Sequence, residues 1–184
     1  MAFFYDFCLD QLTHYAQSYK TVQKGLKRRK ADSDAKKSWE ARLHKLVLLT
    51  FTKCFIYDKE NDFIDSNKFD KIVEPLIDQL DCVGVPMKYN EFIENFVQPA
   101  ILQLFELTKD DYKWKTLNYA LLMKTRSEVN AVKQSAVKTV LKVIEQLRER
   151  AAVLIHDILP FLSETLEDED IEVFFLVTYF LILN

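Results

Sequence analysis

Glycine and proline are scarce in this 184-residue sequence, which contains 2 glycines and 4 prolines. An all-β fold or a glycine-rich nucleotide-binding loop needs more turn residues than that, whereas helices joined by short turns need few. The 3 cysteines are widely spaced and form no CxxC pair, which argues against a zinc site or a disulfide framework. We therefore expect an all-α protein with reduced thiols and no metal.

Motifs for catalysis are missing as well. His14, His44 and His156 are isolated from one another, and no HExxH, Walker A or GxSxG sequence occurs. The residues therefore indicate no enzyme, no cofactor and no small-molecule substrate. The apolar run FFLVTYFLIL covers residues 174–183, but a membrane-spanning helix needs about 20 such residues. We expect a buried helix there, or a segment that awaits a partner, and no membrane anchor.

Apolar residues recur at helical spacing along most of the chain. The periodicity predicts helices over residues 3–22, 39–57, 68–82, 89–107, 114–124, 128–150, 152–166 and 171–183. In the helix at 128–150 the apolar residues cover about half of the circumference, which is wider than a coiled-coil seam. Such a helix can contact both its hairpin partner and a neighbouring hairpin, as in an α-solenoid. The residues expected on this face are Val129, Val132, Ala136, Val137, Val140, Leu141, Val143, Ile144 and Leu147.

The first two helices also present apolar faces. In the helix at 3–22 the face expected to be buried consists of Phe4, Phe7, Cys8, Leu12, Tyr15 and Tyr19. In the helix at 39–57 a broad arc consists of Leu43, Leu46, Val47, Leu49, Thr50, Cys54 and Phe55.

Two signals indicate internal repeats. The segments VEPLIDQL (73–80), VQPAILQL (97–104) and ILPFLSETL (158–166) each carry a proline that we expect near the start of an apolar helix. The segments RSEVNAVKQSA and EDEDIEVFFLV align at a shift of 41 residues, which pairs Val132 with Val173 and Leu121 with Leu162. That period lies in the range of about 40–47 residues that HEAT and armadillo repeats show. We expect a HEAT-like α-solenoid of antiparallel helix hairpins.

Basic residues outnumber acidic ones between Lys20 and Lys45. The stretch KGLKRRKADSDAKK is charged and contains a glycine, so we expect an N-terminal helix at 1–23, a flexible linker at 24–37 and a helical repeat domain at 38–184. The linker cluster is a candidate nuclear localisation signal or phosphate clamp, and a plain solvated linker is the alternative. Its residues are Lys24, Lys27, Arg28, Arg29 and Lys30.

The hairpin at 114–150 is also basic, and a solenoid edge can present such residues to RNA or to a protein partner. A solvated helix face is the alternative. No aromatic-rich RNA-recognition motif is present, so any RNA binding here would be tolerant of sequence. The candidate residues are Lys113, Lys115, Lys124, Arg126, Lys138 and Lys142, with Lys133 inside the apolar arc.

Several strings occur in a characteristic order: the KRRK stretch, SWEARLHKLVLLTFTKCFIYD (38–58), VEPLIDQL, WKTLNYALLMKTR (114–126) and ILPFLSETLEDEDIEV (158–173). Together they resemble the C-terminal domain of a family of very large nucleolar HEAT-repeat proteins of the small-subunit processome, associated with the U-three snoRNA particle. The KCFIYD and WKTLNYALLMKTR strings are the most specific of them.

The resemblance implies a non-catalytic scaffold in ribosome biogenesis that supports processing toward 18S rRNA and is linked to rDNA transcription. It implies a nuclear, nucleolar location, and as partners other processome proteins, with spacer RNA or snoRNA as further candidates. It also implies that the chain is part of a much longer protein. A HEAT-repeat adaptor without an RNA role is the alternative function.

Overall fold

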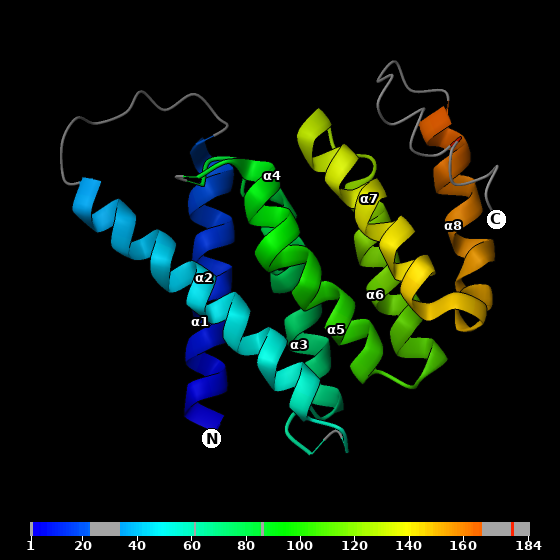
Figure 1. Ribbon diagram of the computed structural model, residues 1–184, viewed down its shortest axis with the longest axis horizontal. Coiled ribbons are helices and arrows are strands. Elements are labelled where there is room, and N and C mark those ends of the chain that lie inside the picture. The colour runs from blue at the N-terminus through cyan, green and yellow to red at the C-terminus, as the bar shows by residue number, and fades with distance from the viewer. Residues whose placement is uncertain (1, 23–33, 61, 86, 167–177, 179–184) are drawn as a thin grey trace. The chain divides into compact units, whose positions relative to one another are not determined.

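The computed structural model describes residues 2–22, 34–60, 62–85, 87–166 and 178 (Figure 1). Every regular element among these residues is a helix, which confirms the all-α prediction. The chain divides into two compact units, Met1–Leu107 and Thr108–Asn184. The domain boundaries expected at 23, 37 and 38 remain predictions.

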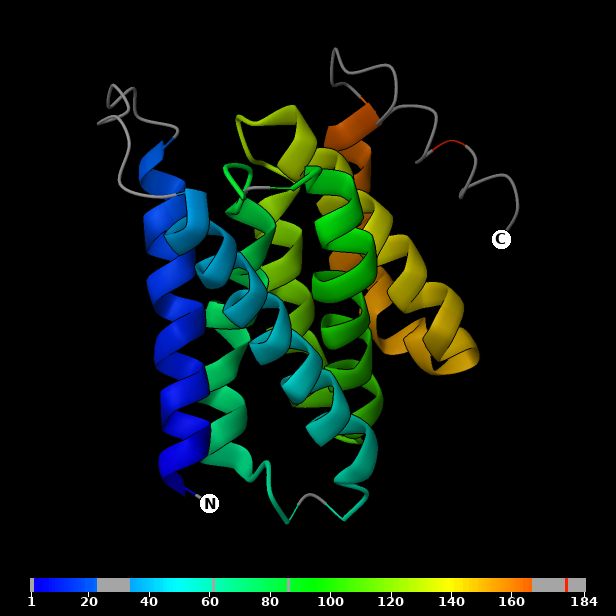
Figure 2. The same ribbon diagram turned by 60° about the vertical axis from the view of Figure 1, so that its left-hand side comes forward.

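The described residues of the first unit form four long or linked helical stretches. They are α1 (Ala2–Val22), α2 (Asp34–Tyr57), α3 (Ser66–Ile77) with the 3-10 turn η1 (Asp78–Asp81), and the run α4 (Tyr89–Phe92), η2 (Ile93–Val97) and α5 (Gln98–Leu107). Helix α1 packs against α2 and α3, and α5 packs against the same two helices; Figure 2 shows α1 beside α2. Helix α2 begins at Asp34 rather than at Trp39, so residues 34–37 are helical.

The buried face of α1 differs in part from the expected one. Cys8, Leu12 and Tyr15 are buried as predicted, but Phe4 and Phe7 are exposed and Tyr5 is buried in their place, along with Ala16. The phenol explains the shift, because Tyr5 donates a hydrogen bond of 2.5 Å to the backbone carbonyl of Lys68 in α3. A buried tyrosine whose hydroxyl finds a partner can enter a core at little polar cost.

A polar cluster centred on Gln79 joins three segments of this unit. The Gln79 side-chain amide Nε2 donates to the backbone carbonyls of Leu12 (3.0 Å) and Pro75 (2.6 Å). Its Oε1 lies 2.6 Å from Nε2 of His44 in α2. The His44 ring stacks on Tyr15, with 4.5 Å between ring centroids. Burial lowers the pKa of His44 to about 4, against a smaller opposing effect of the Gln79 hydrogen bond, so this histidine is neutral at pH 7.

Two aspartates set the connection from α2 to α3. The buried carboxylate of Asp58 accepts hydrogen bonds from the backbone N–H groups of Phe63 (3.0 Å) and Ile64 (2.7 Å), which folds the loop back on itself. Asp65 then caps α3 by accepting from the backbone N–H of Lys68 at 2.9 Å. An aspartate at this position satisfies an N–H that the first helical turn leaves free.

Two of the three prolines do not occupy helix starts as predicted. Pro75 lies inside α3 and Pro160 lies inside α8, so that expectation was wrong for both. Pro99 follows a π-helical stretch at Ile93–Val97. Because a proline ring clashes with the carbonyl four residues earlier and cannot donate to it, the wider π turn gives Pro99 room while the helix continues.

The second unit contains α6 (Asp111–Lys124), α7 (Asn130–Leu147), the 3-10 turn η3 (Arg148–Ala151) and α8 (Ala152–Leu166). Helix α6 packs against both α7 and α8. This is the contact pattern of stacked repeats, in which the first helix of a hairpin touches its own partner and the first helix of the next hairpin. The helix expected at 171–183 lies outside the described residues, except for Thr178.

Two threonines mark corresponding points of the stacked helices. The hydroxyl of Thr125 donates to the carbonyl of Leu122 at 2.7 Å, and the hydroxyl of Thr165 donates to the carbonyl of Leu162 at the same distance. All four residues are buried. The same local bond therefore closes α6 and α8, with a spacing of 40 residues instead of the 41 in the sequence alignment.

The apolar face predicted for α7 is confirmed, since every expected residue from Val132 to Leu147 is buried. Val129 instead caps the helix at a half-buried position. The helix ends at Leu147 and not at Arg150, because Arg148 adopts φ 51° and ψ −127°. A positive φ at a residue with a side chain is strained, and it turns the chain into η3.

Candidate interaction surfaces

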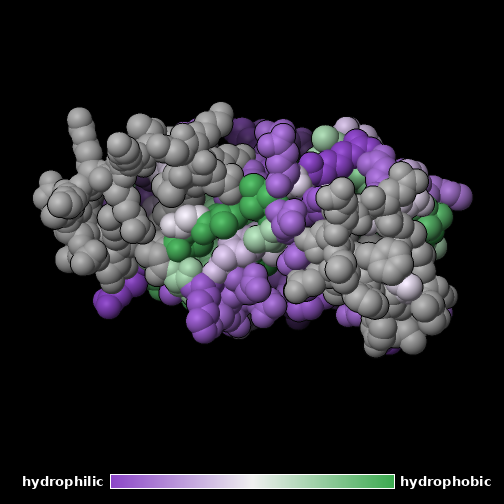
Figure 3. Space-filling view, turned by 90° about the horizontal axis from the view of Figure 1, so that it is seen from above, coloured by the Kyte–Doolittle hydropathy of each residue, from purple (hydrophilic) through white to green (hydrophobic). Residues whose placement is uncertain are grey.

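On the face seen in Figure 3, many of the coloured residues are hydrophilic, and hydrophobic ones gather in a band. None of the described helices is both long and apolar enough to cross a bilayer. Within the described ranges, no group of three His, Cys, Asp or Glu side chains is placed to hold a metal ion. The surfaces that remain to be considered are two basic regions and one apolar helix face.

The first basic region is the cluster from Lys24 to Lys30. It lies outside the described residues, so its role as a localisation signal or phosphate clamp stays a prediction.

The second basic region is the α6–α7 hairpin, whose lysines do not share one face. At 100° per residue, Lys113 and Lys124 lie on one flank of the buried face of α6, and Lys115 lies on the other. On α7, Lys138 and Lys142 lie opposite the buried face, but Glu145 shares that outward side. The outward face of α7 is therefore mixed in charge, and only parts of it can attract a phosphate backbone.

Arg126 has a structural partner within the second unit. Its guanidinium donates from Nε to Glu164 Oε2 at 2.7 Å and from Nη2 to Oε1 at 2.6 Å, a bidentate ion pair. The guanidinium also lies 4.2 Å from the ring centroid of Phe161. Hydrogen bonds from Arg126 hold the pKa of Glu164 below its usual range. Arg126 thus ties the end of the α6–α7 hairpin to α8, and an RNA phosphate would have to replace Glu164 to reach it.

A small polar cavity of about 170 Å³ adjoins this ion pair. Thr125, Arg126, Lys133, Glu164 and Thr165 line it. The two threonine hydroxyls already donate to helix carbonyls. Lys133, which the sequence places inside the apolar arc, also lines this polar cavity, as a long side chain can.

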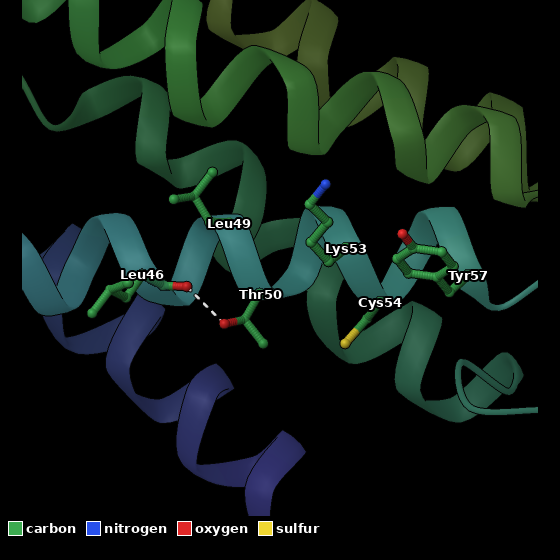
Figure 4. Close-up of a pocket in the computed structure, with 6 residues that line it drawn as sticks. All are labelled: Leu46, Leu49, Thr50, Lys53, Cys54 and Tyr57. Atoms are coloured by element: carbon green, nitrogen blue, oxygen red, sulfur yellow. Dashed lines mark hydrogen bonds between the residues drawn. The ribbon is translucent and has the colours of Figure 1, made fainter.

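The outer face of α2 is the largest departure from the sequence-based expectation. Leu46 and Leu49, both in the apolar arc expected for this helix, are 55% and 41% exposed. They line an open groove of about 430 Å³ together with Thr50, Lys53, Cys54 and Tyr57, all on α2 (Figure 4). The Thr50 hydroxyl donates to the carbonyl of Leu46 at 2.8 Å and so is satisfied within the helix. The groove is consequently apolar, with Lys53 as its cation.

Several long proteins are similar to this chain. It is 36% identical over 128 residues to "HEAT repeat-containing protein 1 homolog" of Dictyostelium discoideum, which covers 69% of the chain. It is 36% identical over 132 residues to human "HEAT repeat-containing protein 1", which covers 71% of the chain. It is 28% identical over 141 residues to "U3 small nucleolar RNA-associated protein 10" of Pyricularia oryzae, which covers 77% of the chain.

The matched region spans 6% of the Dictyostelium and human proteins and 8% of the fungal one. No family model matches the chain, and no solved structure matches it. The names of these relatives and the all-helical structure agree with the HEAT-like solenoid that the sequence predicts.

Proposed function

Because the chain belongs to the family of HEAT repeat-containing protein 1 and U3 small nucleolar RNA-associated protein 10, we propose that it is a non-catalytic scaffold of the small-subunit processome. In this role it supports processing toward 18S rRNA and is linked to rDNA transcription. It works in the nucleolus, with other processome proteins as its direct partners. The observation that carries the proposal is the match to a relative named for its association with U3 small nucleolar RNA.

The fold supports a scaffold because its described helices present long faces. The central histidine of the first unit is buried and neutral, and it bonds to an amide instead of to a nucleophile. Stacked helical repeats provide extended surfaces on which several proteins can assemble. Within the second unit, the Arg126–Glu164 ion pair joins the end of the α6–α7 hairpin to α8. Within the first unit, exposed apolar residues of α2 offer a surface for a partner.

The cluster Lys24, Lys27, Arg28, Arg29 and Lys30 serves nuclear entry or phosphate contact in this proposal. Changing the KRRK residues at 27–30 to alanine removes charge from a segment that the sequence predicts to be a linker. We expect the melting temperature to stay within about 2 °C, because surface substitutions usually change stability by less than about 0.5 kcal/mol. Nuclear accumulation or RNA affinity falls. Unfolding of this variant would show that the segment is not a linker.

RNA contact through the hairpin would be electrostatic and tolerant of sequence. Lys138 and Lys142 are the lysines that point away from the core of α7. If they bind phosphate, replacing both with glutamine reduces the slope of log affinity against log salt by about 2. A slope that does not change assigns this face to protein partners or to solvent.

The location of the protein tests the proposal as a whole. A tagged full chain expressed at its native level is expected to concentrate in nucleoli and to purify with U3 small nucleolar RNA. A chain that stays evenly spread through the cell, with no enrichment of that RNA, would instead support a HEAT-repeat adaptor without an RNA role.

A further inference from the structure

The exposed residues of α2 follow a heptad. Among its described side chains from Trp39 to Ile56, the exposed ones are Trp39, Arg42, Leu46, Leu49, Lys53 and Ile56. Their spacings of three, four and seven residues are those of the a and d positions of a coiled coil. Four of the six are large apolar residues, and the exposed fractions of these four range from 39% to 61%.

A solvent-facing helix surface usually carries polar residues at these positions. The other faces of α2 show why this stripe is separate from the core. Val47, Leu48, Phe51 and Phe55 are buried against the rest of the first unit, where α2 packs on α1 and α5. The stripe is therefore a second apolar surface on the same helix, and it has the narrow width that a single docked helix covers. We call it the α2 seam.

Pairing of two α2 seams is unfavourable because of Arg42 and Lys53. In an antiparallel pair centred between Leu46 and Leu49, Arg42 of one copy would face Lys53 of the other. In a parallel pair, Arg42 would face Arg42 of the other copy, and Lys53 would face Lys53 of the other copy. Like charges at seam positions oppose association in both orientations, which excludes a second copy as the preferred occupant.

We propose that the α2 seam docks an amphipathic helix of a partner protein, whose own apolar seam carries two carboxylates that face Arg42 and Lys53. The two cations are eleven residues apart, which corresponds to about 16.5 Å along a helix at 1.5 Å per residue. The partner therefore carries two Asp or Glu residues at the same eleven-residue spacing, with leucine-like residues at the seam positions between them.

The groove shown in Figure 4 gives this helix its central contact. Leu46, Leu49 and Lys53 line the groove, and Tyr57 closes one end with a side chain that is 75% exposed. A leucine of the partner fits between Leu46 and Leu49, next to the satisfied hydroxyl of Thr50. A carboxylate one turn away reaches the Lys53 amine. This proposal does not depend on the processome role, since it rests on the α2 surface alone.

Designed helical peptides test the proposal on the full chain. One peptide has leucine at its a and d positions except for two glutamates eleven residues apart, and the other has lysines in place of those glutamates. We expect the glutamate peptide to bind about tenfold more tightly or better, as measured by fluorescence anisotropy. The double variant Arg42→Glu and Lys53→Glu is expected to reverse this preference, and its fold is checked by circular dichroism.

A matched control makes an equal change in net charge at two lysines outside the α2 seam. Lys109→Glu with Lys115→Glu alters two exposed lysines of the second unit, and it should keep the preference for the glutamate peptide. The proposal would be overturned if neither peptide binds or if both bind equally well. It would also be overturned if the Arg42→Glu and Lys53→Glu double variant still prefers the glutamate peptide.

Photo-crosslinking identifies the occupant in cells. A photoreactive residue placed at Tyr57 should link to one segment whose sequence has an apolar heptad and two acidic residues eleven positions apart. Crosslinks to a second copy of this chain would overturn the proposal. Because the peptide assay needs no ribosomal particle, its result also stands if the processome role fails its own test.

Discussion

Acidification should weaken the first unit through one buried histidine. His44 has no exposed surface in the structure, and burial lowers its folded-state pKa from the usual 6.5 to about 4. In the unfolded chain the imidazole takes up a proton near pH 6.5. Between these two values the unfolded state binds more protons than the folded state, so stability falls as pH falls.

The size of the effect follows from the two pKa values. Between the two pKa values, each pH unit lowers the free energy of unfolding by at most about 1.4 kcal/mol. Over the whole interval the free energy of unfolding therefore falls by about 3 kcal/mol. The contribution of neutral His44 to the free energy of unfolding is complete above pH 6.5 and fully lost below about pH 4. Between pH 7.5 and pH 5 the free energy of unfolding should decrease by about 2 kcal/mol.

The contacts of His44 explain why the proton is excluded. Since Gln79 Nε2 donates to two backbone carbonyls, its Oε1 faces His44, whose Nε2 therefore carries the hydrogen of the 2.6 Å bond. The ring contacts Tyr15 and Phe92, at centroid distances of 4.5 and 4.9 Å. A second proton would put a charge between two aromatic side chains without access to water.

Urea unfolding followed by far-UV circular dichroism at a series of pH values measures this effect. The control pair is His44→Gln, which keeps a side-chain N–H donor but does not titrate, and His14→Gln, which changes an exposed histidine of the same helix bundle. The His44 variant should lose most of the slope between pH 7.5 and 5, and the His14 variant should keep it. Equal slopes in the wild type and the His44 variant would refute the reasoning.

Three further substitutions test local features. Asp58→Ala removes the acceptor of two loop N–H groups and should lower the free energy of unfolding by about 2–3 kcal/mol in urea titrations; a loss below about 0.5 kcal/mol would contradict the loop assignment. Arg148→Gly relieves a positive φ and should raise the melting temperature, with a gain of about 1 kcal/mol, and a lower melting temperature would count against the strained turn. Asn118 is fully buried, and neither side-chain polar atom has a hydrogen-bond partner among the described residues. Asn118→Leu should therefore stabilise the protein by about 1 kcal/mol in thermal unfolding, and destabilisation would show that the amide has a partner.

Helix periodicity predicted most of this fold because each helix buries one continuous face. The face of α7 from Val132 to Leu147 follows directly from the spacing of its apolar residues. The cap at Asp65 was also predictable, since an aspartate before a helix accepts from the first free N–H. These features depend on residues close together in sequence.

Features that depend on distant residues could not be read from the sequence. Tyr5 replaces Phe4 in the core because its hydroxyl reaches a carbonyl of α3, 63 positions away. The sequence predicts Arg126 to lie on a candidate RNA or partner surface, but it gives no sign of its ion-pair partner Glu164, which lies 38 positions further along the chain. Periodicity gives the amount of apolar surface on a helix, but it does not show which neighbour covers each part.

The α2 seam is a second feature that helix periodicity alone could not show. Its leucines belong to one broad apolar arc in the sequence, and the heptad became visible only after the structure had separated the buried from the exposed positions. The spacing of Leu46, Leu49, Lys53 and Ile56 could have indicated a second helix-binding face. The arc, however, was wide enough to explain both leucines as core.

Synthesis of ribosomal RNA after depletion of the protein tests the central claim most directly. In cells that make this chain as part of their endogenous protein, pulse-labelled 18S rRNA is expected to fall while large-subunit rRNA from the same precursor is affected less. Restoring the protein should recover 18S synthesis. If depletion leaves the labelling of 18S rRNA and its precursors unchanged, the chain is not a scaffold of small-subunit assembly.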